Sequence, residues 1–361
     1  MEWPKTVQAM GSEMTGRRGP AGVGVAVLVA AAILMALPAG AQTAFVDSGG
    51  RSVTLPQRVD KVLPAGPPAA VVLYTLAPEK LLGWVRAPDA ESLAYLAPRW
   101  RNLPVPGRIT GRNGLAPAAI KALGADLIVD FGDVTPAYVE LANRTQAETG
   151  IAYVLVDGAL GDSAKAYRSL GQAVHSEARG QQLASASSGL LDEVAGKVAT
   201  GAAAGPKRVY IARGPDGNET YGAGAFNDDV LARAGAVNVA RDWGRGLLKD
   251  IAPEKVREAN PDMVIALDPY FLEVVGRTPA WKAVGAIAAG HLRVAPRRPF
   301  GWLDEPPGVN RLIGVRWLAG VLYPERFGPT RQAVRDFFRT FYQVELGDAA
   351  LDKLLDESRT P

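Results

Sequence analysis

Short runs of consecutive apolar residues recur along the chain and alternate with stretches of helical periodicity. A short, continuous apolar run is typical of a strand that is buried on both faces. Strands that alternate with helices predict parallel sheets with helices on both faces. The apolar runs lie at residues 59–63, 81–85, 127–130, 153–156, 209–212, 263–267 and 292–295.

One stretch in the middle of the chain lacks this alternation. Residues 163–200 contain no apolar run, and their apolar side chains are spaced three or four positions apart, as on one face of a helix. Gly180 is the expected break between two helices in this stretch. We therefore predict a long helical connector between two α/β halves.

The two halves share a faint internal repeat. Residues 115–129 and 251–265 have the same order of features, 136 positions apart: a short helix that begins at a proline, then an aspartate, then a buried strand. Such a repeat is expected of duplicated lobes. The matching pairs are Ala116 and Ala252, Pro117 and Pro253, and Asp126 and Asp262.

The first 41 residues have the layout of a secretory signal peptide. Arg17 and Arg18 precede an apolar run at residues 22–37, and small residues follow up to Ala41. We predict cleavage after Ala41 and an exported, periplasmic protein. The predicted division of the chain is a signal peptide at 1–41, an N-terminal α/β lobe at 42–160, a connecting helical segment at 161–201, a C-terminal α/β lobe at 202–345 and a tail at 346–361.

The composition excludes several classes of site. The chain has no cysteine, which excludes disulfides, thiolate metal sites and a cysteine nucleophile. It has two histidines, too few for a multi-histidine metal site. The net charge is +3, so nothing indicates a nucleic-acid partner. No metal site is predicted.

Motifs of catalysis are missing from the sequence. There is no Walker A pattern, no nucleophile elbow and no paired-carboxylate motif. An exported α/β enzyme that acts on an anionic substrate stays open as an alternative. It would need a carboxylate as general base. The candidates are Asp216, Asp268 and Asp304.

Arginine and aromatic residues gather in the loops that follow the predicted strands. Ligands of open α/β sheets bind at the carboxyl ends of the strands. An arginine side chain offers a planar fork of donors for anionic oxygens, and an aromatic ring offers a flat contact surface. These loops therefore predict a binding site for an anionic ligand. The ligand-binding candidates are Arg297, Arg298, Trp302, Arg213, Tyr221, Arg112 and Tyr270.

An ordered set of segments resembles the class III periplasmic binding proteins of ABC importers. The resemblance covers about residues 44–330. Its parts are an opening strand pair at 45–56, the segment 76–84, the Pro261-Asp262 unit and, most tellingly, residues 301–325. It implies two Rossmann-like lobes joined by one long helix, with the ligand in a cleft between the lobes.

The resemblance also implies partners and a docking residue. In this family each lobe has a glutamate that docks to the membrane permease, and Glu254 matches that position in the second lobe. The first lobe has Ala118 instead, and Glu79 and Glu91 are candidates to replace the missing carboxylate. The implied partners are an ABC permease and its ATPase. We expect a monomer that meets the membrane only through the permease.

The function predicted from these features is capture and delivery of a small metal chelate, with a ferric siderophore as the first choice. No covalently bound cofactor is expected, and the ligand is an iron chelate on this hypothesis. The resemblance leaves a molybdate- or tungstate-like oxyanion, haem and cobalamin open as alternatives. Arginines and helix N-termini suit the oxyanion as well as the anionic chelate.

Overall fold

The computed structural model describes residues 44–200 and 205–356, and the predicted signal peptide lies outside these residues. The N-lobe, residues 44–159, has a parallel sheet in the order β3-β4-β5 and an antiparallel pair β1-β2. Its strands are β1 (Ala44–Val46), β2 (Ser52–Thr54), β3 (Val62–Pro64), β4 (Leu127–Gly132) and β5 (Ala152–Asp157). Its helices are α1 (Pro67–Leu76), η1 (Pro78–Lys80), η2 (Ser92–Tyr95), η3 (Pro98–Trp100), α2 (Pro117–Ala122) and α3 (Pro136–Thr149).

The C-lobe, residues 205–323, has a second parallel sheet in the order β11-β10-β6-β8 and a small antiparallel pair β7-β9. Its strands are β6 (Lys207–Ala212), β7 (Thr220–Tyr221), β8 (Ala236–Asn238), β9 (Leu247–Leu248), β10 (Met263–Ala266) and β11 (Leu292–Val294). Its helices are α6 (Phe226–Arg233), η6 (Arg241–Trp243), α7 (Pro253–Ala259), α8 (Phe271–Arg277), α9 (Pro279–Lys282), α10 (Gly285–Ala288) and α11 (Arg311–Leu322).

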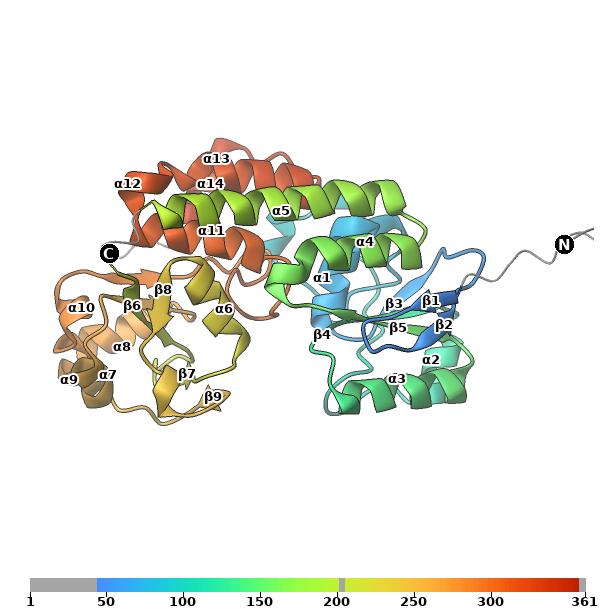
Figure 1. Cartoon of the computed structure of the whole chain (residues 1–361), viewed down its shortest axis with the longest axis horizontal. Coiled ribbons are helices and arrows are strands. Elements are labelled where there is room, and N and C mark those ends of the chain that lie inside the picture. Colours follow the sequence, from blue (N-terminus) through green and yellow to red (C-terminus); the bar gives the residue numbers. More distant parts are fainter. Residues whose placement is uncertain (1–43, 201–204, 357–361) are drawn as a thin grey trace, which may run out of the picture. The chain divides into compact units, whose positions relative to one another are not determined.

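Helices cover both faces of both sheets (Figure 1). In the N-lobe, α1 and α4 (Ser163–Ala173) pack on one face of the sheet, and α2 and α3 pack on the other. In the C-lobe, α6 and α11 lie on one face and α7 to α10 on the other. The prediction of two α/β lobes with parallel sheets is confirmed.

Six of the seven predicted strands exist, but residues 81–85 form none. Leu81 makes only an isolated bridge to Val62, and its neighbour Leu82 donates one backbone hydrogen bond to the Val62 carbonyl, 3.0 Å away. The run is apolar because Leu81 and Trp84 are buried in the core. Burial therefore produced the strand-like pattern without a strand. The short edge strand β8 was not predicted.

The repeated helix-strand units use the same hydrogen bonds. The Asp126 amide donates to the Lys61 carbonyl at 2.9 Å, and its carboxylate accepts from the Lys61 amide at 2.8 Å. The Asp262 amide donates to the Arg208 carbonyl at 2.7 Å, and its carboxylate accepts from the Arg208 amide at 2.8 Å. Each aspartate thus ties its strand to the neighbouring strand, which supports the internal repeat.

The connector consists of η4 (Leu160–Asp162), α4 and the long helix α5 (Glu177–Ala199). The break lies at residues 174–176, where His175 has a positive φ of 53°, so the predicted break at Gly180 is wrong. Gly180 lies inside α5, on the side of the helix that faces α4. A Cβ atom there would lie 2.7 Å from the Tyr167 carbonyl oxygen, so only glycine permits this close helix pair.

The C-terminal helices return to the N-lobe. They are α12 (Pro324–Phe327), α13 (Thr330–Phe337), the π-helical turn η7 (Phe338–Tyr342) and α14 (Asp348–Asp356). The Tyr74 hydroxyl donates to the Tyr342 carbonyl at 3.3 Å, and the Tyr95 hydroxyl donates to the Ala350 carbonyl at 3.2 Å. Residues 346–361, predicted as a tail, include α14, which buries Leu351 and Leu354.

Within the described parts of the chain, no helix has both the length and the apolar character that crossing a membrane requires.

Candidate functional site

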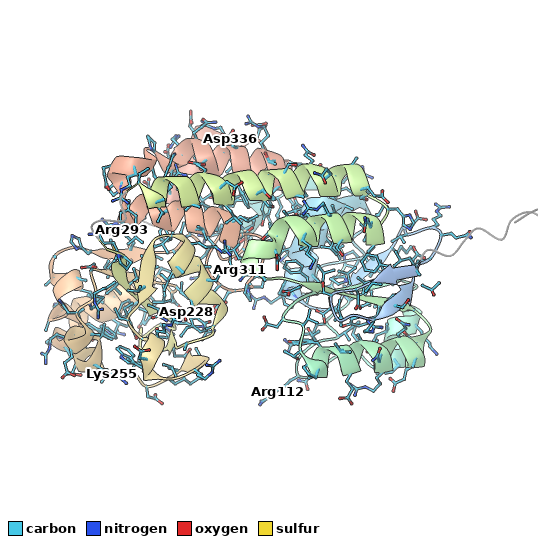
Figure 2. All side chains as sticks on the ribbon, viewed as in Figure 1. Arg112, Asp228, Lys255, Arg293, Arg311 and Asp336 are labelled. Atoms are coloured by element: carbon cyan, nitrogen blue, oxygen red, sulfur yellow. The ribbon has the colours of Figure 1, made fainter. Side chains whose placement is uncertain are left out.

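The carboxyl ends of the N-lobe strands lie under a loop that contains two arginines. The backbone amides of Ile109 and Thr110 donate to the Ala65 carbonyl at 2.8 and 3.0 Å, which fixes residues 107–114 beside the end of β3. Arg108 donates to the Arg112 carbonyl at 2.8 Å. The Arg112 side chain is exposed and extends from the N-lobe (Figure 2). A cation is therefore accessible at this sheet edge.

The start of α1 offers fewer donors than an ordinary helix N-terminus. Pro67 and Pro68 open the helix, and proline has no amide hydrogen. Gly66 must be glycine here, because a Cβ atom would lie 2.6 Å from the Thr110 hydroxyl oxygen. This helix start therefore offers few backbone amides to an anion. The arginines carry more of the positive charge here than the helix does.

Arg213, at the end of β6 in the C-lobe, is surrounded by carboxylates. Its Nε lies 3.4 Å from Asp304 Oδ2, and its Nη2 lies 3.2 Å from Glu305 Oε1. It also forms an ion pair with Glu219, which Lys249 approaches to 3.3 Å. Partial burial disfavours the Arg213 cation, but these anionic neighbours outweigh it and raise its pKa.

Tyr221 is buried beside the same cluster. Its hydroxyl donates to Asp304, and Arg213 lies over its ring, 5.9 Å from the ring centroid. Burial raises the pKa of Tyr221, and the Asp304 carboxylate raises it further. Tyr221 therefore stays protonated and holds Asp304 in place. The predicted ligand residues Arg213 and Tyr221 are neighbours, but Asp304 already engages both.

Arg297 and Tyr270 lie in the loops that follow the adjacent strands β11 and β10. Both are exposed, and Arg297 Nη1 lies 4.0 Å from Asp268 Oδ1. The Tyr270 hydroxyl accepts a hydrogen bond from Arg277 at 2.8 Å. Arg297 therefore carries an accessible charge at the C-lobe strand ends, and Tyr270 an accessible ring.

Arg298 and Trp302 have structural partners. Arg298 forms an ion pair with Glu91 of the N-lobe, so both side chains are engaged within the molecule. Trp302 is fully buried, and its indole donates to the Arg298 carbonyl at 3.1 Å. Trp302 therefore supports the loop and offers no ring face to a ligand, contrary to the sequence-based prediction.

Arg311 is a buried arginine that the sequence analysis did not single out as a site residue. It begins α11 and is only 5% exposed. Its Nε donates to the Gly308 carbonyl at 3.2 Å, and its Nη2 donates to the Gly158 carbonyl at 2.6 Å. Asn310, which precedes the helix, makes no side-chain cap; it bonds Tyr342 and the Phe300 carbonyl. The only signal in the sequence was a charged residue within an apolar helix.

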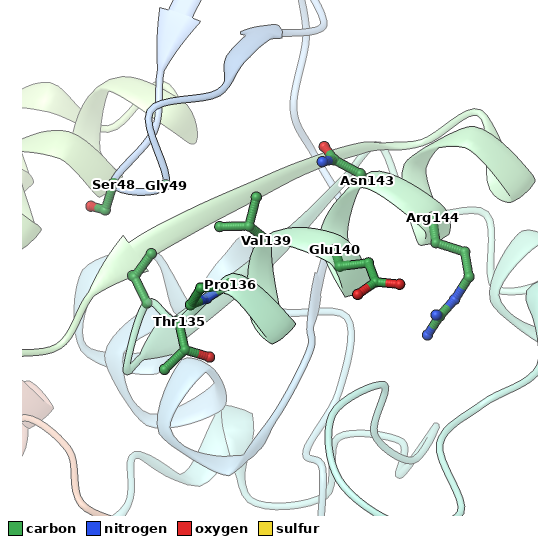
Figure 3. A pocket seen from close by; sticks show the side chains of 9 residues that line it. Ser48, Gly49, Thr135, Pro136, Val139, Glu140, Asn143 and Arg144 are labelled. Atoms are coloured by element: carbon green, nitrogen blue, oxygen red, sulfur yellow. The ribbon is translucent and has the colours of Figure 1, made fainter.

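A surface groove of ≈ 690 Å³ lies on the N-lobe (Figure 3). The β1–β2 turn contributes Ser48 and Gly49 to it. The other lining residues come from the start of α3 and the loop before it: Val134, Thr135, Pro136, Val139, Glu140, Asn143 and Arg144. None of the predicted ligand residues lines this groove, so we do not assign it to the solute site.

Among residues 44–200 and 205–356, no group of three or more His, Asp or Glu side chains has an arrangement that fits a metal ion.

Comparisons with known proteins identify the family. A family model described as periplasmic binding protein matches residues 138–299. The molybdate-binding protein MolA of Haemophilus influenzae is 25% identical over 323 residues, which cover 82% of this chain and 90% of MolA. An ABC transporter solute-binding protein from Sulfurospirillum deleyianum has a TM-score of 0.79 at 26% identity, over 87% of this chain and 99% of that one. The MolA structure with bound molybdate has a TM-score of 0.67 at 20% identity, over 84% and 99%.

The chain is thus similar to the class III periplasmic binding proteins along most of its length. These are the solute-binding components of ABC importers, so the prediction of a binding protein rather than an enzyme is confirmed. A cognate transporter, permease with ATPase, is the partner that the family implies. Asp216, Asp268 and Asp304 therefore need no role as general bases.

The two positions that the sequence analysis predicts for permease docking are both exposed. Glu254 lies in the first turn of α7, and Ala118 lies in the first turn of α2. Glu79, in η1, is exposed as well. The helices α2 and α7 are the repeated helices described above, so the two lobes present the same backbone with different side chains.

Proposed function

We propose that this binding protein captures an oxyanion of the molybdate and tungstate class and delivers it to an ABC permease. The observation that carries the proposal is the pair of exposed arginines at the strand ends of the two lobes, Arg112 and Arg297. A planar guanidinium donates two parallel hydrogen bonds to a pair of anionic oxygens. The match to MolA along most of both chains supports a ligand of this chemistry.

A ferric siderophore is the second candidate, and one observation favours it. Tyr270 is 41% exposed in the loop after β10, and Arg277 lies over its ring, 5.3 Å from the ring centroid. An aromatic ring beside a cation suits a flat, anionic chelate better than it suits a small tetrahedral ion. The two candidates share the requirement for positive charge and differ in the need for a flat contact surface.

A thermal-shift screen of residues 42–361 separates the candidates. The panel contains molybdate, tungstate, sulfate, ferric siderophores, haem and cobalamin. A ligand at about 100 times its Kd adds about 2.7 kcal/mol to the free energy of unfolding. We expect molybdate or tungstate to raise the melting temperature. A shift with a ferric siderophore alone would retain the transport role and replace the oxyanion by the chelate.

Substitution of Arg297 tests the position of the site. Arg297→Ala should weaken anion binding at least tenfold, measured by calorimetry; Arg298 is left in place because it pairs with Glu91 of the N-lobe. Arg168→Ala is the matched control, because Arg168 is exposed on α4, away from the strand ends. Unchanged affinity in the Arg297→Ala variant would move the solute site away from these loops.

Docking of the loaded protein rests on Glu254 in this proposal. Its carboxylate is exposed in the first turn of α7 and is available to a basic residue of the permease. Glu254→Gln should leave solute affinity unchanged and lower uptake in cells that carry the cognate transporter. Reduced solute affinity in this variant would count against a pure docking role.

A further inference from the structure

Arg311 connects two parts of the chain that lie far apart in the sequence. Its Nη2 donates to the carbonyl of Gly158, which directly follows β5 of the N-lobe and lies 153 positions away. Its Nε donates to the carbonyl of Gly308 in the segment that leads into α11 of the C-lobe. One side chain therefore hydrogen-bonds to both lobes. Figure 2 labels Arg311 near the start of α11.

The acceptor in the N-lobe is held firmly. The Gly158 amide donates to the Gly132 carbonyl at 2.9 Å, at the end of β4. A Cβ atom on Gly158 would lie 2.9 Å from the Gly132 Cα and 3.0 Å from the Phe131 ring, so the position requires glycine. The Gly158 carbonyl is thus a fixed acceptor at the carboxyl ends of β4 and β5.

Burial makes this contact strong. Arg311 is about 95% buried, and burial lowers its pKa although Asp229, Asp133 and Asp304 favour the charged form. Of these carboxylates, Asp133 belongs to the N-lobe and the other two to the C-lobe. A hydrogen bond from a charged donor is worth more in a buried setting than at the surface, and its loss leaves an unmatched carbonyl.

A small cavity lies beside the guanidinium. Its volume is ≈ 10 Å³, about the room for one water. Apolar side chains make up most of its lining, together with Gly158, Ser163, Gly308 and Arg311; they are Val72, Phe131, Ala166, Tyr167 and Val309. The Arg311 guanidinium is therefore a charged group in a largely apolar contact between the lobes.

We propose that Arg311 is the positioning residue that joins the two lobes and sets their relative orientation for solute binding. The effect on solute affinity rests on the proposed function, whereas the effect on lobe orientation does not. When a variant populates the binding-competent orientation for only a fraction of the time, the apparent Kd rises by the inverse of that fraction.

The experiment measures the distance between the lobes without solute. The chain has no cysteine, so Lys121→Cys on α2 and Glu258→Cys on α7 give two unique, exposed sites for spin labels. Arg311→Ala should broaden the distance distribution at least twofold and raise the Kd for molybdate at least tenfold. Arg311→Lys keeps the charge but not the guanidinium that donates on two sides. Its distance distribution and its Kd for molybdate should therefore lie between those of the parent and of Arg311→Ala.

Arg316→Ala is the matched control on the same helix. Arg316 is equally buried, and it bonds Glu193 and the Phe327 carbonyl but no residue of the N-lobe. This variant should lower the melting temperature as Arg311→Ala does, with an unchanged distance distribution and a Kd within twofold of the parent.

Two results overturn the proposal. One is a folded Arg311→Ala protein with the parent's distance distribution and Kd. The other, if the alanine variant does not fold, is an Arg311→Lys protein that behaves like the parent. If the parent binds no anion of the panel, the proposed function fails, and the label distances alone decide the role of Arg311.

Discussion

The strand ends of the two lobes differ in how their arginines are engaged. Arg112 of the N-lobe is exposed, and its backbone carbonyl accepts a hydrogen bond from Arg108. Arg213 of the C-lobe is held by Glu219, Asp304 and Glu305. A guanidinium among three carboxylates attracts an external anion less than an exposed one does. The comparison indicates that N-lobe charge is available to a solute, whereas Arg213 organises its own loop.

The scaffold beneath these loops is the same in both lobes. Asp126 and Asp262 tie equivalent strands with equivalent hydrogen bonds. The two lobes therefore differ in the side chains at their strand ends and share the aspartate hydrogen bonds that tie neighbouring strands together. This separation makes each lobe a control for the other.

The largest expected effect concerns the helix pair that lies between the lobes in the sequence. Gly180→Ala should lower the free energy of unfolding by about 2–3 kcal/mol, because its Cβ would meet the Tyr167 carbonyl at 2.7 Å. Gly189→Ala, on the same helix with nothing within 4 Å, should raise it by about 0.5–1 kcal/mol. Urea denaturation measures both. Equal changes in the free energy of unfolding for the two variants would mean that the close contact between α4 and α5 does not require glycine at position 180.

The next largest loss of stability is expected when the repeated aspartates, Asp126 and Asp262, are replaced. Asp126→Ala removes a carboxylate that accepts from the Asp60 and Lys61 amides, both at 2.8 Å, and should cost about 2 kcal/mol. In the second lobe, Asp262→Ala removes one such bond and should cost about 1 kcal/mol. Thermal unfolding compares the two. A larger loss of stability for Asp262→Ala than for Asp126→Ala would contradict this ranking of the two lobes.

Substitution of Arg112 and of Arg213 tests the comparison between the strand ends of the two lobes. Arg112→Ala should weaken anion binding about tenfold, about 1.4 kcal/mol, with a melting temperature close to the parent's. Arg213→Ala should lower the melting temperature, because three carboxylates lose their shared cation, and should change anion affinity less. Calorimetry and thermal unfolding give the two values. The reverse result would make Arg213 the principal anion receptor.

The smallest expected effect concerns the exposed helix starts. Ala118→Glu places in the N-lobe the carboxylate that Glu254 supplies in the C-lobe. An acid in the first turn of a helix should add about 0.3–0.5 kcal/mol to stability. Glu254→Ala should remove a similar amount. Uptake assays with both variants then show whether docking requires one carboxylate or two.

The sequence predicted the two parallel sheets, the connector and the repeat because each follows from local periodicity. It also placed Arg213, Arg297, Arg298 and Tyr270 at strand ends. It did not predict which arginines are engaged, because the partners come from distant segments: Glu91 for Arg298 and Gly158 for Arg311. Trp302 was misread because a buried tryptophan and a ligand-facing tryptophan look the same in a loop sequence.

The return of the C-terminal helices to the N-lobe has a consequence for folding during synthesis. Tyr74 contacts Tyr342, 268 positions later, through a hydrogen bond and through rings 5.5 Å apart. The core around Tyr74 and Tyr95 is therefore complete only after almost the whole chain has been made. The first lobe to be synthesised is thus the one whose core must wait for the last helices.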